Sequence, residues 1–205
     1  MLRTVTTSVG KAKVKNPVSL IGWVMGVVIL WSWFGSQSWA AMYLVPNASV
    51  EVETQTIPYD PKATLHPMVA EALGDFERME QAVEAQRLDE LMGFYSADYN
   101  YHGLKLPDVR RVWGEVFTHY DALSSTHLFS QVKLFRTGAR WNAEFTCTGG
   151  LYGTERESGK RITIDSWFRE VHYLVKDAGV WRFVGNAGDA PKNAPFTSAP
   201  HHPLF

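Results

Sequence analysis

The sequence contains one cysteine and no run rich in lysine and arginine. A single cysteine, Cys147, cannot form a disulfide within the chain or a cysteine-based metal cluster. Without a basic patch or a nucleic-acid motif, the chain lacks the electrostatic surface that phosphate binding requires. The seven histidines do not follow metal-ligand spacing, and His201-His202 lies between prolines near the C-terminus. We therefore exclude nucleic acid as a partner and predict neither a metal nor a cofactor.

Charge is absent from a long stretch near the N-terminus. Four basic residues stand before this stretch: Arg3, Lys11, Lys13 and Lys15. An apolar run from Val18 to Phe34 follows, and no charged residue appears again until Glu51. All 21 acidic residues and the other 16 of the 20 basic residues lie beyond position 40, so the remainder of the chain carries a net charge of −5.

Two interpretations fit this basic-then-apolar order. The first is a signal peptide with an apolar region at 20–33 and cleavage near Ala40, after Ser38-Trp39. The second is a transmembrane anchor over 17–41, because roughly 20 apolar residues cross roughly 30 Å of hydrocarbon. We favour the anchor, since the uncharged stretch is longer than a signal peptide requires. It would contact membrane lipid directly.

Both interpretations place the rest of the chain on the far side of the membrane, because the basic segment 1–16 is retained in the cytoplasm. The expected location is the inner membrane, with a single span and the domain in the periplasm. Cleavage would instead give a soluble periplasmic or secreted protein.

Proline-rich segments flank the region that should fold. The segment 42–65 contains Pro46, Pro58 and Pro61 without a helical period, which predicts an extended tether. The segment 189–205 contains four more prolines and predicts a tail that does not fold alone. These boundaries leave one domain over 66–188.

The first half of this domain shows helical periodicity. From Pro67 the apolar residues repeat with a helical period and form one stripe: Val69, Ala72, Leu73, Phe76, Met79 and Val83. The charged residues Glu71, Asp75, Glu77 and Arg78 lie away from this stripe. A short helix over 88–95 and a strand over 97–104 follow. Pro107 and Asp108 suit the first turn of a third helix, which continues to about residue 120.

The second half predicts four strands in antiparallel hairpins. Aromatic and β-branched residues dominate the ranges 126–136, 140–152, 160–175 and 180–186, and turn residues such as Thr137-Gly138 separate them. Gly149-Gly150 inside the second of these strands indicates a bulge or sharp bend. The expected fold class is α+β.

This order of elements resembles the nuclear transport factor 2-like superfamily, which includes ketosteroid isomerase, polyketide-cyclase-like proteins and scytalone dehydratase. The most specific stretches are LDELMGFYSADYNYHG (88–103) and FREVHYLVKDAGVWRFVGNAGD (168–189), within a resemblance that covers about residues 66–187. It implies a curved antiparallel sheet that wraps around three helices into a cone with an apolar pocket. It also implies that dimers often form across the outer sheet face.

The resemblance also implies where a catalytic base would lie. The isomerase branch has a carboxylate near the end of the first strand, where this sequence has Gly103 beside His102. The candidate catalytic residues are therefore His102, Asp165, Tyr99 and Tyr101, and none of them completes a known catalytic signature. By strand alternation, Asp165 should share a face with Trp167, Arg169 and Tyr173, opposite Ser166, Phe168, Glu170 and His172.

Aromatic residues are the other candidate ligand contacts. Most should be core, and a minority should line the cone mouth beside Asn186; the set is Tyr95, Tyr99, Tyr101, Trp113, Trp141, Phe145, Trp167 and Trp181. Cys147, between two threonines on a strand, should be a small buried residue.

Two functions remain open at this point. The first is a membrane-anchored binding module, an accessory or assembly subunit that contacts a protein partner or a second copy and holds a small apolar ligand. The second is a lyase, isomerase or cyclase that uses the cone pocket. The absent carboxylate and the anchor favour the first.

Overall fold

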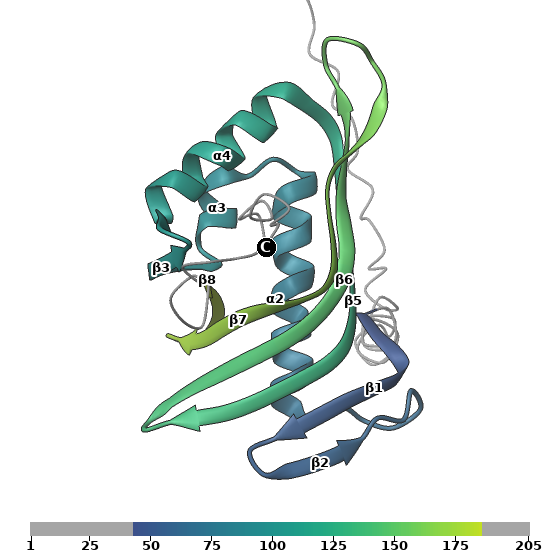
Figure 1. Ribbon diagram of the computed structural model, residues 1–205, viewed down its shortest axis with the longest axis vertical. Coiled ribbons are helices and arrows are strands. Elements are labelled where there is room, and N and C mark those ends of the chain that lie inside the picture. Colours follow the sequence, from purple (N-terminus) through teal and green to yellow (C-terminus); the bar gives the residue numbers. More distant parts are fainter. Residues whose placement is uncertain (1–42, 186–205) are drawn as a thin grey trace, which may run out of the picture. The chain divides into compact units, whose positions relative to one another are not determined.

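The computed structural model describes residues 43–185, which form one eight-stranded sheet and three helices. The sheet bends around the helices, so that the long helix lies against one face of the central strands (Figure 1). The elements are β1 (Leu44–Val52), β2 (Gln55–Pro58), α2 (Pro67–Glu84), α3 (Leu88–Met92), β3 (Tyr95–Tyr101), β4 (Leu104–Lys105), α4 (Leu106–His119), β5 (Tyr120–Thr137), β6 (Arg140–Glu155), β7 (Arg161–Asp177) and β8 (Val180–Gly185).

Helix α2 forms where the apolar stripe predicts it. His66 caps the helix, because its Nδ1 atom accepts a hydrogen bond from the backbone N–H of Met68 (3.3 Å). Pro67 follows at the first helical position, where a missing N–H costs nothing. The whole predicted stripe is buried, but so is Asp75, which we expected on the exposed side.

Asp75 is buried because it satisfies a backbone group of the sheet. Its Oδ2 atom accepts a hydrogen bond from the N–H of Trp181 on β8 (2.8 Å), and its other oxygen pairs with Arg78. A buried N–H without a partner would be costly, so this position needs an acceptor although it lies among apolar residues.

Two helices and a tight hairpin follow α2. In α4 the side chain of Asp108 accepts a hydrogen bond from the N–H of Lys105 (2.9 Å), as expected for an acidic residue in a first turn. The strand expected at 97–104 is interrupted by His102 and Gly103, whose φ angles of 49° and 94° form a two-residue turn. It therefore becomes β3 and β4.

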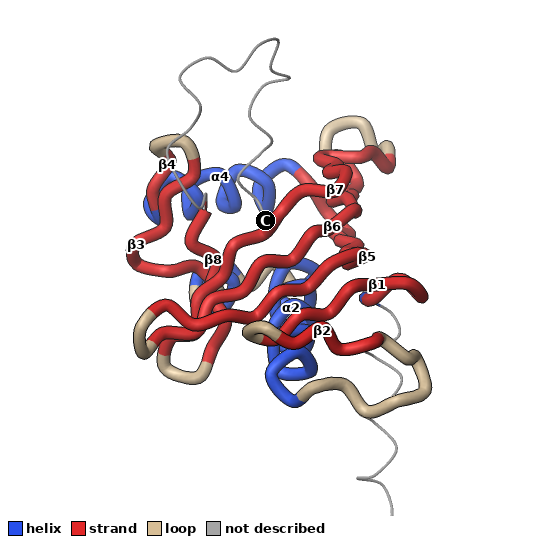
Figure 2. The backbone as a smooth tube through the Cα atoms, turned by 60° about the horizontal axis from the view of Figure 1, so that its bottom comes forward, coloured by secondary structure: helices blue, strands red, loops and turns tan. Residues whose placement is uncertain are grey.

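Long antiparallel hairpins form the centre of the sheet, as predicted. The strand order is β2-β1-β5-β6-β7-β8-β3-β4, which can be followed across the sheet in Figure 2. The predicted bulge lies at Gly149, where a Cβ atom would come within 1.9 Å of the carbonyl oxygen of Thr126. Only glycine allows the two strands to approach so closely here.

The sheet is mixed, whereas an entirely antiparallel sheet was expected. β1 runs parallel to β5, and β3 runs parallel to β8. Both parallel pairs join strands separated by helices, because a parallel neighbour requires a long crossover.

Most of the segment 42–65 belongs to the sheet, so the prediction of an extended tether is wrong there. β1 pairs with β5, and β2 folds back on β1 as an edge strand. Buried Leu44, Ala48 and Val50 attach β1 to the core. Pro46 lies where the β1–β5 register shifts, and Pro58 ends the edge strand, so neither proline interrupts the ladder. The domain thus begins about twenty residues earlier than predicted.

Within residues 43–185, no helix combines the length and apolarity that a membrane span needs. The predicted anchor at 17–41, the residue Asn186 and the tail at 189–205 lie outside the described residues.

Candidate functional site

Three of the predicted ligand contacts are core residues beside α4. The indole N–H of Trp113 donates a hydrogen bond to the hydroxyl of Tyr95 (2.8 Å), and the ring of Tyr95 meets that of Tyr99 edge-on at 5.4 Å. All three side chains are buried. Burial raises the pKa of both tyrosine hydroxyls, so they stay protonated at any physiological pH.

Phe145 and Trp181 are also core residues, whereas Trp141 is not. Phe145 packs against Phe76 and Phe129, with ring centroids at 5.3 and 5.0 Å. Trp141 is half-buried at the end of the β5–β6 hairpin, beneath the guanidinium of Arg136. Trp141 therefore packs against the core from its edge and is not enclosed within it.

A cluster of polar side chains surrounds Tyr101 at the end of β3. Its hydroxyl pKa is raised, first by partial burial and then by the negative charges of Glu170 and Asp165. Asp165 is half-buried, and its Oδ1 atom accepts the N–H of Ser166 (2.8 Å). The exposed His102 ring stands edge-on against the Tyr101 ring at 4.6 Å. His102 thus contacts Tyr101 from the turn, whereas Asp165 on β7 acts on the Tyr101 hydroxyl only through its charge.

A bulge in β7 changes which residues share a face. Arg169 has a φ angle of 55°, and the two residues Phe168 and Arg169 stand opposite Thr148 alone. Alternation is therefore shifted by one residue, and Trp167 and His172 are buried together with ring centroids at 6.2 Å. The expected grouping of Trp167 with Arg169 and Tyr173 is wrong for this reason.

The interior contains a polar cluster that the sequence analysis did not identify. The Nδ1 atom of His127 lies 2.6 Å from Oε1 of Glu80, and the Tyr43 hydroxyl donates to Oε2 of the same carboxylate (2.6 Å). The His127 side chain is fully buried and that of Glu80 is 13% exposed. The alternation of His127 with Phe129 on β5 was a signal for the burial of this histidine, but nothing in the sequence paired it with Glu80.

This cluster determines how a neutral His127 ring is protonated. A carboxylate accepts hydrogen bonds only, so the proton stays on Nδ1 and Nε2 is the basic nitrogen. The ring is enclosed by Phe76 and Trp167, at centroid distances of 5.4 and 5.0 Å, and by His172 at 5.9 Å. A carboxylate, two imidazoles and a tyrosine hydroxyl are thus concentrated in an otherwise apolar interior.

Cys147 is buried, as predicted. The indole N–H of Trp167 donates to its sulfur atom (3.2 Å), and burial raises the pKa of the thiol to about 12. A thiol with this pKa is not a nucleophile at neutral pH. Among residues 43–185, no three His, Cys, Asp or Glu side chains are grouped closely enough to bind a metal ion.

The outer face of the sheet carries an exposed apolar patch formed by Leu128, Phe168 and Val171. Their exposed fractions are 47%, 77% and 37%. Leu128 lies on β5, and Phe168 and Val171 lie on β7. Thr148 of the intervening strand β6 pairs with Leu128 and faces the bulge that contains Phe168. Single exposed apolar residues are common, but a group of neighbours is typical of an interaction site.

Comparison with known proteins gives structural relatives only. No protein-family model matches the chain, and no curated protein matches it. Solved structures with a similar arrangement include Aln2 from a Streptomyces species, at 12% identity and a TM-score of 0.44, covering 60% of this chain and 90% of that one. A ketosteroid isomerase-like protein from Erwinia carotovora atroseptica has 15% identity and a TM-score of 0.44, with 59% and 94% covered. ActVI-ORFA from Streptomyces coelicolor has 14% identity and a TM-score of 0.41, with 58% and 94% covered.

Residues 43–185 form a curved, mixed sheet with helices packed against one of its faces. Similarity of this degree identifies no function, so the function must be argued from the surfaces and clusters of this chain.

Proposed function

We propose that this chain is a membrane-anchored interaction module. Its segment 17–41 stays in the inner membrane, and its domain faces the periplasm and binds a protein partner as an accessory or assembly subunit. The observation that carries this proposal is the apolar patch of Leu128, Phe168 and Val171 on the outer face of the sheet.

The energetics of Phe168 support a partner on this face. A phenylalanine that is 77% exposed gains little from the fold of its own chain. Burying it against a partner would contribute about 1.5–3 kcal/mol, enough to make it a central contact of an interface. The neighbouring Trp167 is buried, so Phe168 at the β7 bulge lies on the opposite, outer face.

The candidate catalytic residues give less support to an enzyme. His102 is exposed in a turn, and the carboxylate of Asp165 already accepts a backbone N–H. Most of the predicted ligand contacts are buried in the core. A small apolar ligand in the cone would have to fit among these aromatic rings, so we place ligand binding there second to partner binding.

Photocrosslinking in intact membranes tests the partner face. The full-length chain carrying benzoylphenylalanine at position 168 should form a crosslinked product, and the same group at exposed Glu157 in the β6–β7 turn should not. Leu128→Asp should reduce the product without changing the amount of chain in the membrane.

The mass of the product identifies the partner. A product of twice the chain mass would show that the partner is a second copy, whereas a different mass would indicate another subunit. Equal crosslinking from positions 168 and 157, or none from either, would refute the proposal.

The anchor is tested separately by the intact mass of the protein extracted from membranes. Retention of the full 205 residues supports the anchor. Loss of about the first 40 residues would mean a soluble exported domain and would remove the basis for a membrane subunit.

A second candidate function, an acid-base enzyme, is favoured by the buried pair of Glu80 and His127. A carboxylate that holds the proton on Nδ1 prepares an imidazole to act as a general base. If a substrate is found, the Glu80→Gln chain should show no turnover although it still unfolds in a cooperative thermal transition. Turnover that survives this substitution would exclude the pair from catalysis.

A further inference from the structure

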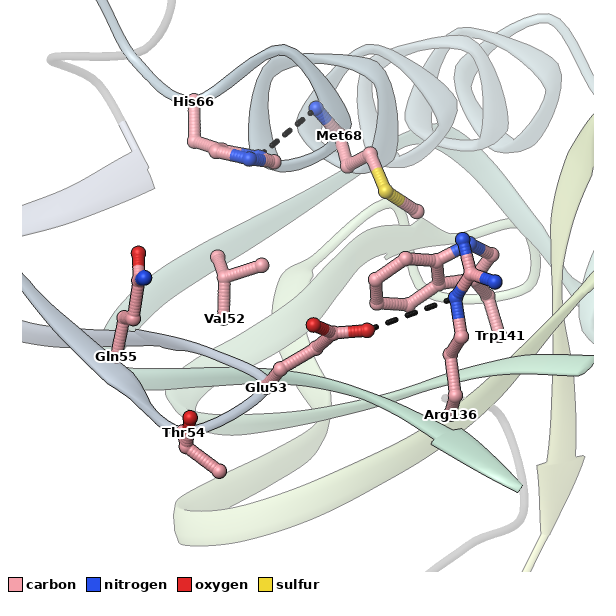
Figure 3. Close-up of a pocket in the computed structure, with 8 residues that line it drawn as sticks. All are labelled: Val52, Glu53, Thr54, Gln55, His66, Met68, Arg136 and Trp141. Carbon is pink, nitrogen blue, oxygen red and sulfur yellow. Dashed lines mark hydrogen bonds and ion pairs between the residues drawn. The ribbon is translucent and has the colours of Figure 1, made fainter. Parts of the chain in front are cut away.

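A pocket of about 360 Å³ opens at the end of the domain where the β1–β2 and β5–β6 turns approach the start of α2. His66 and Met68 stand on one side of it and the β1–β2 turn on the other, while Arg136 and Trp141 close one end (Figure 3). None of its lining residues belongs to the apolar patch or to the interior polar cluster. Its volume is at the lower end of the range for small-molecule sites.

Arg136 is the main charged donor in this pocket. It pairs directly with Trp141 across the β5–β6 hairpin, and its guanidinium carbon lies 4.5 Å from the centroid of the indole ring. Stacking of this kind occupies one flat face of the guanidinium and leaves the N–H groups at its edge available for acceptors in the plane.

The charge of Arg136 is only weakly compensated. Its Nε atom lies 3.6 Å from Oε1 of Glu53, and both side chains are 55% exposed. This distance is too long for a hydrogen bond, and exposed ion pairs contribute little. Within the described part of the chain, the two Nη groups of Arg136 have no shorter contact with an acidic side chain.

The neighbouring polar groups add further donors. Nδ1 of His66 accepts the N–H of Met68, which places the proton of a neutral ring on Nε2 and makes that atom a donor. Thr54 and Gln55 in the β1–β2 turn contribute a hydroxyl and an amide. Val52, Met68 and the Trp141 ring form the apolar part of the lining, and Glu53 adds a carboxylate.

We infer that this pocket binds a small carboxylate with a flat apolar body. The carboxylate would accept hydrogen bonds from both Nη groups of Arg136. A guanidinium edge suits this bidentate geometry better than an ammonium group does. The body would lie against Met68 and the exposed part of the indole ring. Glu53 would remain beside Nε and keep the guanidinium oriented.

Calorimetric titration of the full-length chain tests this inference with phenylacetate as the probe. We expect saturable binding of phenylacetate and about 10- to 100-fold weaker binding of phenylacetamide, which has the same shape without the charge. Arg136→Gln should weaken phenylacetate binding by a similar factor. Arg140→Gln, on the same hairpin but outside the pocket, should leave it unchanged.

Several results would overturn the inference. One is the absence of saturable phenylacetate binding to a chain that melts cooperatively, and another is equal binding by the Arg136→Gln chain. If inorganic phosphate bound as tightly as phenylacetate, the apolar part of the lining would contribute nothing to recognition. Because this pocket is separate from the patch at Phe168, Arg136→Gln should not alter crosslinking from position 168, and the two proposals can fail independently.

Discussion

Replacing Asp75 with alanine should destabilise the domain by about 2–3 kcal/mol. Asp75 projects from α2 to the N–H of Trp181, at the start of β8. The β3–β8 ladder begins only at Phe183, which pairs with Tyr95, so β3 does not satisfy the Trp181 N–H. The Asp75 carboxylate extends the ladder by one hydrogen bond across 106 residues of sequence.

The expected loss of stability follows from the burial of Asp75. Asp75 is 2% exposed, so its removal leaves a buried backbone donor without an acceptor, and a hydrogen bond to a charged group contributes about 1.5–3 kcal/mol. The partner Arg78 is 55% exposed and adds no more than about 1 kcal/mol. For a domain of this size the loss corresponds to a fall in melting temperature of about 4–12 °C.

Asp75→Asn is the matched control, because its amide oxygen can still accept the Trp181 N–H. Burial raises the pKa of Asp75 above the ordinary value of 3.8, although the Trp181 N–H and Arg78 oppose this shift. The folded state therefore holds the proton more tightly than the unfolded state, and stability decreases as the pH rises from about 4 through the folded pKa. The asparagine variant lacks this decrease, so it should gain stability relative to the native chain over that pH range.

Thermal unfolding by circular dichroism, measured on all three chains across this pH range, checks both expectations. Differences between variants cancel the titration of the other carboxylates. A loss below about 0.5 kcal/mol for Asp75→Ala, or an asparagine variant that loses stability relative to the native chain as the pH rises, would refute the reasoning.

Four further substitutions are tested by the same unfolding measurement. Gly149→Ala should cost about 3 kcal/mol, because the added Cβ meets the Thr126 carbonyl oxygen at 1.9 Å, whereas Gly114→Ala in α4 meets nothing within 4 Å and should stabilise by up to about 1 kcal/mol. Tyr43→Phe should cost about 1–2 kcal/mol, since it removes the 2.6 Å hydrogen bond to Glu80, and an unchanged melting temperature would contradict that bond. Phe168→Ser should change stability by less than about 0.5 kcal/mol, because the side chain is 77% exposed; a large loss would show that it supports the fold instead of a partner.

Local patterns in the sequence predicted most of the helices and hairpins. The stripe from Val69 to Val83 specified α2 because helical neighbours three and four residues apart must share a face. The turns at Thr137-Gly138 and Asp177-Ala178-Gly179 specified the hairpins, and the adjacent glycines specified a bulge. These features depend on residues close together in the chain, so the sequence contains them directly.

The candidate sites depend on contacts that local patterns cannot show. Prolines in 42–65 concealed β1, whose partner β5 lies more than seventy residues away, and the bulge at Arg169 reversed the expected faces of β7. Neither the pairing of Glu80 with His127 nor the position of Trp141 beside Arg136 and the start of α2 follows from residue spacing.

The sequence by itself thus determined the class of fold and the order and approximate bounds of most elements from α2 onward, because short-range periodicity and turn chemistry encode them. Only the tertiary structure decided which polar side chains meet in the interior, which apolar residues stay on the outer face and where a pocket opens. Those outcomes are determined by the registers of strands distant in sequence, where a shift of one residue moves a side chain to the opposite face of the sheet.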